Sequence, residues 1–137
     1  QVEDLDYQLE AQIQARDLNI EMLETIGRVV LSLNIDKMST AELKRDVRLY
    51  AKNDPQDFLD TLNDPMLKMQ NLASRLIDQK LLTLKNNGKD IYFNIKGNKT
   101  KLVSIPFGQN SIYTLASFFQ TDDGIEVMTM LESKLQD

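Results

Sequence analysis

The sequence predicts a mainly helical α+β protein: a long N-terminal helix, a three-helix segment, a three-stranded antiparallel β-meander and C-terminal helices. Three observations predict this class. Apolar residues recur at helical spacing through the first part of the chain, two Asn-Asp-Pro sequences mark helix starts, and short strand-like segments with Asn-Gly and Gly-Asn turns follow residue 80. We expect residues 1–35 to form an amphipathic or coiled-coil helix and residues 36–137 to form a compact domain.

Composition restricts the chemistry that this chain can perform. The 137 residues include 42% apolar and 27% charged residues, which is typical of a globular protein. Cysteine and histidine are both absent, so the chain lacks thiol nucleophiles, the commonest metal ligand and the usual general base. We therefore expect no enzymatic activity, catalytic residues, metal or cofactor, although an enzyme that uses paired carboxylates stays an alternative. No apolar run is long enough to span a membrane, and we expect a cytoplasmic protein that binds no membrane.

Residues 1–33 are predicted to form one long helix. Apolar residues follow a 4-3 spacing that places them on one seam, which Asp6, Arg16 and Gly27 interrupt. The seam consists of Val2, Leu9, Ile13, Ile20, Leu23 and Val30. We expect self-association through Leu9, Ile13, Ile20, Leu23 and Val30. The alternative is a single amphipathic helix that folds back on its own domain.

Three further helices are predicted over residues 40–52, 55–62 and 65–80. Ser39 and Glu42 have the spacing of a capping box at the start of the first. The two Asn-Asp-Pro sequences put Asp54 and Asp64 at N-cap positions, each followed by a proline at the first helical position.

The chain then changes to strand-like segments at residues 81–87, 90–96 and 101–107. Turns are expected at Asn87-Gly88 and Gly97-Asn98. In the second strand, alternation places Ile91, Phe93 and Ile95 on the core face and Tyr92 on the other. Helices are expected over residues 111–120 and 125–135, the second capped by Thr121.

Charge is distributed unevenly along the chain. The net charge is −5, yet residues 66–101 contain eight Lys or Arg and two Asp, a net of +6, so the remainder carries −11. Such asymmetry indicates an oriented interaction surface. The basic segment could contact nucleic acid, contact an acidic protein, or be the solvated face of a small sheet whose lysines prevent aggregation.

The order of three helices followed by a hairpin, over residues 40–105, resembles the winged-helix family. That resemblance implies a third helix in the major groove and a wing on the DNA backbone. The contact residues would be Lys68, Asn71 and Arg75 on the 66–80 helix, and Lys85, Lys89, Tyr92, Lys96, Lys99 and Lys101 on the 81–105 hairpin. The same residues could contact an acidic protein partner.

The segments "RLYAKNDPQDFLDTLNDP", "KDIYFN", "KLVSIPFG" and "ASFFQTDDGIEVMTMLE" resemble small uncharacterised accessory proteins of tailed bacteriophages. This resemblance spans about residues 45–135 and implies a viral protein of the virion or the host cytoplasm, with no catalytic motif. We therefore predict a non-catalytic, oligomeric assembly or adaptor protein of phage origin that acts through protein–protein contacts. The alternative is a winged-helix-type DNA-binding protein.

Overall fold

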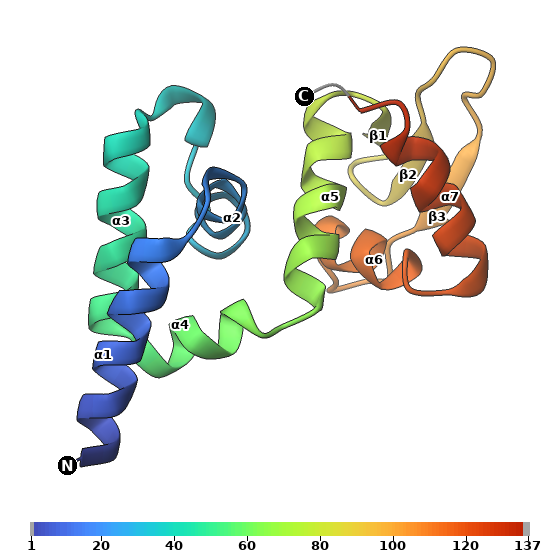
Figure 1. Cartoon of the computed structure of the whole chain (residues 1–137). Helices are drawn as coiled ribbons and strands as arrows, with labels where there is room; N and C mark the ends of the chain where they lie inside the picture. Colours follow the sequence, from blue (N-terminus) through green and yellow to red (C-terminus); the bar gives the residue numbers. More distant parts are fainter. Residues whose placement is uncertain (1, 136–137) are drawn as a thin grey trace. The chain divides into compact units, whose positions relative to one another are not determined.

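A computed structural model describes residues 2–135, with side chains from residue 6 onward. By their internal contacts the residues form two compact units, Gln1–Leu67 and Lys68–Asp137. The model confirms the α+β, mainly helical class (Figure 1). The sequence predicts a boundary at residue 35, whereas the contacts divide the chain after Leu67.

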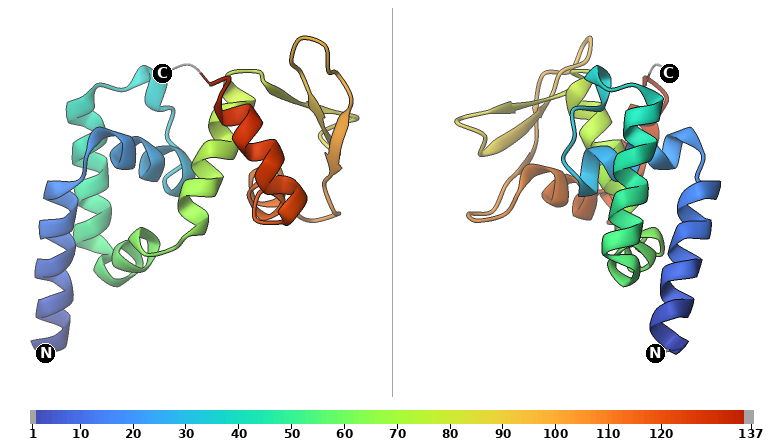
Figure 2. Two further views of the ribbon diagram at one scale, coloured as in Figure 1. Left: turned by 45° about the vertical axis from the view of Figure 1, so that its right-hand side comes forward. Right: turned by 90° about the vertical axis from the view of Figure 1, so that its left-hand side faces the viewer.

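The first unit is helical. Its elements are α1 (Val2–Asp17), α2 (Ile20–Thr25), the π-helical turn η1 (Ile26–Val30), the 3-10 turn η2 (Ile35–Lys37), α3 (Thr40–Asn53) and α4 (Pro55–Leu62). Helix α1 packs on both α3 and α4. Helices α1 and α3 run side by side in opposite directions (Figures 1 and 2).

The prediction of one helix over residues 1–33 is wrong because α1 ends at Asp17 and a separate helix, α2, begins at Ile20. Asn19 has an extended backbone, and its side chain accepts a 2.9 Å hydrogen bond from the backbone N–H of Met22. An N-cap residue of this kind starts a new helix and cannot continue the preceding one.

This break also divides the predicted seam. Leu23 is only 2% exposed within the core of the first unit, and Val30 packs against that core. Leu9 and Ile20 are exposed, and Ile13 is half-buried. The five predicted contact residues therefore do not form one continuous exposed seam, and the side chain of Val2 lies outside the described residues.

The predicted starts of α3 and α4 are confirmed. Ser39 and Glu42 form the full capping box, with both hydrogen bonds at 3.1 Å. Pro55 is the first residue of α4, but the side chain of Asp54 makes no capping hydrogen bond. Asp64 instead accepts a 2.9 Å bond from the backbone N–H of Met66 at the start of α5 (Met66–Asp78).

The core of the first unit brings α1 against α3 and α4 through small and aromatic residues. Ala11 and Ala15 of α1 are buried, which allows the helices to approach closely. The rings of Tyr50 and Phe58 meet edge to face, with centroids 5.5 Å apart. The buried set is Ala11, Ala15, Leu23, Ile26, Leu43, Val47, Tyr50, Ala51, Phe58 and Leu67.

The second unit contains the predicted meander. Strands β1 (Leu82–Lys85), β2 (Asp90–Phe93) and β3 (Lys101–Ser104) pair antiparallel in the order β1-β2-β3. The first turn places Asn86 and Asn87 at positive φ, a conformation that asparagine tolerates better than most residues. Helices α6 (Ser111–Phe118) and α7 (Asp122–Glu132) follow, and Thr121 caps α7 as predicted.

Helices α5, α6 and α7 pack against one face of the sheet (Figure 2). Ile91 and Phe93 are buried there, as predicted, together with Leu72, Leu76, Leu115, Phe119 and Leu131. Because side chains alternate along a strand, Asp90 and Tyr92 lie on the opposite face.

The winged-helix arrangement is not confirmed. Helices α3 and α4 belong to the first unit, together with α1 and α2. Helix α5 continues into the second unit, where it packs with the sheet and the C-terminal helices. The three predicted helices and the hairpin therefore do not share one compact domain.

Candidate functional site

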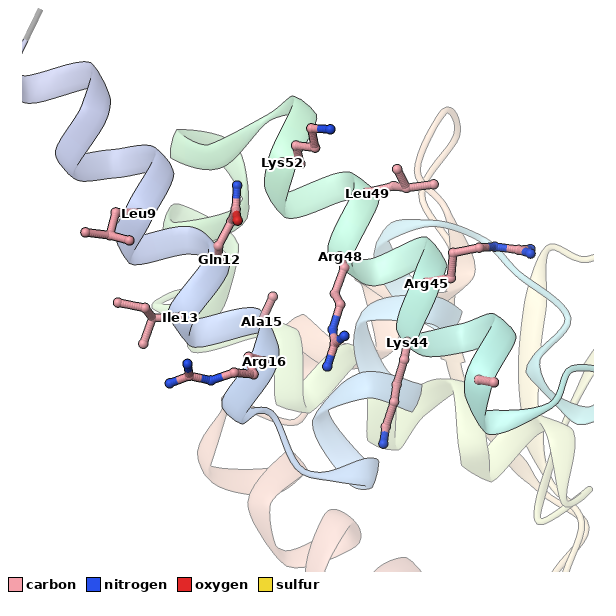
Figure 3. A pocket seen from close by; sticks show the side chains of 11 residues that line it. Leu9, Gln12, Ile13, Ala15, Arg16, Lys44, Arg45, Arg48, Leu49 and Lys52 are labelled. Carbon is pink, nitrogen blue, oxygen red and sulfur yellow. The ribbon is translucent and has the colours of Figure 1, made fainter.

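The first unit carries a groove of about 740 Å³ between α1 and α3 (Figure 3). We call it the basic groove. Its lining residues are Leu9, Gln12, Ile13, Ala15, Arg16, Ala41, Lys44, Arg45, Arg48, Leu49 and Lys52.

Helical periodicity explains why these side chains meet. One face of α3 is buried in the core, through the side chains of Leu43, Val47, Tyr50 and Ala51. The four-residue spacing of Lys44, Arg48 and Lys52 then aligns these cations along a neighbouring face. Figure 3 shows Lys44 and Arg48 reaching into the space between the two helices.

The basic groove concentrates positive charge in an acidic unit. Residues 1–67 contain seven Lys or Arg and 14 Asp or Glu, yet five of those seven cations line the groove. None of the described lining residues is acidic. The groove is therefore a local positive surface on a unit of net charge −7.

Two of these five cations pair with a carboxylate that the structure describes. Arg16 pairs with Asp17 at 3.1 Å and Arg45 pairs with Asp46 at 3.4 Å. Exposed pairs of this kind contribute little. Lys44, Arg48 and Lys52 form no salt bridge with any side chain that the structure describes. The last three are therefore available to an anionic partner.

The groove also exposes apolar side chains. Leu9 is 63% exposed and Leu49 is 47% exposed, and Ile13 is half-buried. Apolar area in water costs about 25 cal/mol per Å² relative to burial. A partner that covers these three residues therefore gains free energy in addition to any charge interaction.

A second hollow, of about 610 Å³, lies on the other side of the same α1 ridge. It is lined by Asp6, Tyr7, Leu9, Glu10, Ile13 and Leu59, the last from α4. We call the side chains of Asp6 and Glu10 the acidic flank. Leu9 and Ile13 line both hollows, so they form an apolar ridge with the basic groove on one side and the acidic flank on the other.

The sequence identified only part of this site. Leu9 and Ile13 were expected to contact a partner, and both line the groove. Arg16 interrupts the predicted seam, and the predicted contact residues include none of the cations of α3. The four-residue spacing of Lys44, Arg48 and Lys52 was the available signal.

The outer face of the sheet brings several predicted contact residues together. The ammonium group of Lys85 lies 4.7 Å from the centre of the Tyr92 ring. Lys101 pairs with Asp90 at 3.3 Å, and the Nζ of Lys99 donates to Oδ1 of Asn94 at 2.7 Å. These lysines therefore already have partners on their own sheet.

Asp90 is the acidic centre of this face. Its carboxylate accepts hydrogen bonds from Asn86 at 2.6 Å and from Ser104 at 2.9 Å. These bonds, and then Lys101, hold the pKa of Asp90 below its usual range. The carboxylate stays ionised, so it offsets part of the lysine charge.

The other predicted contact residues are dispersed. Lys89 and Lys96 are exposed in the two turns of the sheet, and Lys68 is exposed on α5. Arg75 is half-buried. Asn71 was predicted on an outer face, which is wrong, because it is only 7% exposed and does not present its amide to a ligand.

Neither a metal-binding cluster nor a membrane-spanning helix is found among the described residues. In the part of the chain that is described, no three acidic side chains gather in an arrangement that could hold a metal ion. None of the described helices has both the length and the apolar composition needed to span a membrane.

Neither the phage resemblance nor the winged-helix resemblance gains support from known proteins. No protein-family model, curated protein or solved structure matches this chain.

Proposed function

We propose that this protein is a non-catalytic assembly or adaptor protein that binds an acidic amphipathic helix in the basic groove. One observation carries the proposal: five cations line the same groove as the exposed apolar side chains of Leu9 and Leu49, and no described lining residue is acidic. An amphipathic helix seated between two helices is a recurrent mode of protein recognition.

Each part of the groove has a role in this binding. Leu9, Ile13 and Leu49 contact the apolar stripe of the partner helix. Lys44, Arg48 and Lys52 pair with carboxylates beside that stripe. Complementary charge selects acidic partners and raises the association rate more than it raises affinity.

The apolar residues favour a protein over a nucleic acid at this site. Phosphate backbones are bound by cations and polar groups, and their affinity comes mainly from counterion release. The exposed side chains of Leu9 and Leu49 have no charge and no hydrogen-bond donor that could contact a phosphate. The carboxylates of the first unit, which outnumber its cations two to one, repel a polyanion.

Fluorescence anisotropy with a designed peptide tests the proposal. The peptide has leucine at helical a and d spacing and glutamate elsewhere, and its counterpart has lysine in place of glutamate. We expect saturable binding of the acidic peptide and no binding of the basic peptide. Replacing Arg48 and Lys52 by glutamine should weaken it about tenfold or more, whereas the same change at Lys89 and Lys96 should not.

Two outcomes contradict the proposal. One is the absence of acidic-peptide binding even at low salt, at protein concentrations where the chain is a monomer. The other is binding that the Arg48→Gln, Lys52→Gln variant retains in full, because the peptide would then occupy another surface. Duplex DNA bound at the groove, with no peptide bound, would assign the groove to nucleic acid.

A second candidate function is nucleic-acid contact through the outer face of the sheet. It is supported by Lys85, Tyr92 and Lys101, which lie together on the face opposite the helices. Single-stranded nucleic acid suits this surface, because aromatic side chains stack on bases while lysines contact phosphates.

A further inference from the structure

The partner of the basic groove is the question that the proposed function leaves open. We propose that it is a second copy of this chain, with α1 of each copy seated in the groove of the other about a two-fold axis parallel to α1. This inference rests on the proposed function, since it names the acidic helix that the groove receives.

Helix α1 has the chemistry that the groove requires. Its outward side carries the apolar ridge of Leu9 and Ile13 and the acidic flank of Asp6 and Glu10. It has 16 residues, so it is about 24 Å long. The described part of α1 thus presents an uncovered apolar ridge beside two carboxylates, which is the pattern that the groove would bind.

The arrangement of charge on the first unit is self-complementary. Across its outer side, the order is acidic flank, apolar ridge, basic groove and then α3. A two-fold axis parallel to α1 reverses this order in the partner copy. The ridge of one copy then enters the groove of the other, and the acidic flank of each faces α3 of the other.

The directions of α1 and α3 place the acidic residues of one copy close to the basic residues of the other. Because α1 and α3 are antiparallel, the N-terminal part of α1 lies beside the C-terminal part of α3 (Figure 1). Figure 3 shows Leu9 and Gln12 toward the end of the groove that holds Lys52. Rotation about an axis parallel to α1 leaves each residue at the same position along that axis. Asp6 and Glu10 of one copy therefore approach Lys52 and Arg48 of the other.

The other two-fold arrangement is disfavoured by charge. An axis perpendicular to α1 leaves the order across the surface unchanged, so acidic flank meets acidic flank and basic groove meets basic groove. Like charges brought together at an interface cost several kcal/mol. The parallel arrangement is therefore the one that satisfies both sets of charges, and a two-fold contact closes as a dimer.

Charge exchange tests this dimer. The first variant, Asp6→Lys with Glu10→Lys, makes the flank basic. The second, Arg48→Glu with Lys52→Glu, makes the groove acidic. Glu126→Lys with Glu132→Lys, and Lys89→Glu with Lys96→Glu, are controls with the same changes of charge at exposed positions of the second unit. Circular dichroism of each variant establishes that its helices are retained.

Sedimentation velocity over a dilution series gives the dissociation constant of each protein. We expect a dimer for the unaltered chain and for both controls. Each flank or groove variant alone should dimerise about a hundredfold more weakly or worse. An equimolar mixture of the two should recover the dimer, as should a chain with all four substitutions, because opposite charges then face each other again.

The apolar ridge supplies a separate measurement. Leu9→Ser should weaken the dimer, whereas Ile20→Ser should not. Ile20 is 50% exposed and belongs to the predicted seam, but it does not line the groove. If Ile20→Ser is as damaging as Leu9→Ser, the contact follows the seam and the groove dimer is wrong.

The remaining outcomes separate this inference from the proposed function. A chain that stays monomeric throughout the series but binds the acidic peptide overturns the dimer and leaves the adaptor function standing. A dimer that survives both charge variants overturns the inference, because the copies then meet elsewhere. A monomer that binds no acidic peptide overturns both.

Discussion

The hydroxyl of Tyr50 donates a 2.5 Å hydrogen bond to Oδ2 of Asp57 and lies 3.0 Å from Oγ1 of Thr61. Tyr50 belongs to α3, whereas both of its partners belong to α4. The ring of Tyr50 also meets Phe58 edge to face. This cluster joins α3 to α4 on the core side of the helix whose other side lines the basic groove.

Tyr50→Phe should destabilise the first unit by about 1 kcal/mol. The substitution keeps the ring and its contact with Phe58 but removes the hydrogen bonds to Asp57 and Thr61. Urea denaturation followed by circular dichroism measures the change. Tyr113→Phe is the matched control, since Tyr113 is exposed. Equal effects of the two substitutions would contradict a specific role for Tyr50.

Stability should also fall at alkaline pH because of Tyr50. Burial, followed by the hydrogen bond to Asp57, raises the pKa of Tyr50 to about 12 from its usual value of 10.0. The folded state therefore holds this proton where the unfolded state loses it. The contribution is complete below pH 10.0 and is lost as pH rises toward about 12.

The difference in unfolding free energy between the unaltered chain and Tyr50→Phe isolates this titration from that of the lysines. It should be constant below pH 10 and shrink above it. A difference that stays the same across this range would show that the proton on Tyr50 is not linked to folding.

Gly124→Ala should destabilise the second unit by about 3 kcal/mol. A Cβ at Gly124 would lie 1.7 Å from the carbonyl oxygen of Phe118, which is backbone and cannot move aside. Gly88→Ala is the comparison: it meets open space, but its φ of +78° costs an alanine about 1 kcal/mol. Thermal unfolding should rank Gly124→Ala as the more damaging, and the reverse order would contradict this packing.

Ser39→Ala should cost about 1 kcal/mol, because it removes the side-chain acceptor of the capping box at the start of α3. Denaturant unfolding measures this loss. Thr129→Ala, on the exposed side of α7, serves as the control and should change stability less. A cost no greater than that of the control would mean that the start of α3 does not depend on its cap.

Binding of single-stranded DNA tests the outer face of the sheet. If that face contacts phosphates, Lys85→Gln with Lys101→Gln should weaken binding and lower the slope of log K against log salt by about 1.4. Fluorescence anisotropy at several salt concentrations measures both. Lys44→Gln with Lys52→Gln is the control for the groove. Unchanged affinity and slope in the sheet variant would exclude this surface.

Local sequence signals predicted most of the elements. The capping box at Ser39, the proline at the start of α4 and the Asn-Gly turn near residue 87 each satisfy backbone groups within a few residues of themselves. Such signals act without tertiary contacts, so α3, α4 and the β-meander could be predicted from the sequence. Asn19 is a signal of the same kind: it caps α2, so the predicted helix over residues 1–33 is divided there.

The sequence by itself determined the helical content, the meander, the absence of cysteine and histidine, and the alternation that buries Ile91 and Phe93. Only the tertiary structure decided which helices pack together, and therefore that the cations of α3 line the same groove as Leu9 and Ile13 of α1. The physical reason is the separation along the sequence over which each kind of interaction acts. Caps and periodicity act over a few residues, whereas the groove joins residues 9–16 to residues 41–52, whose proximity depends on how α1 buries Ala11 and Ala15 in the core.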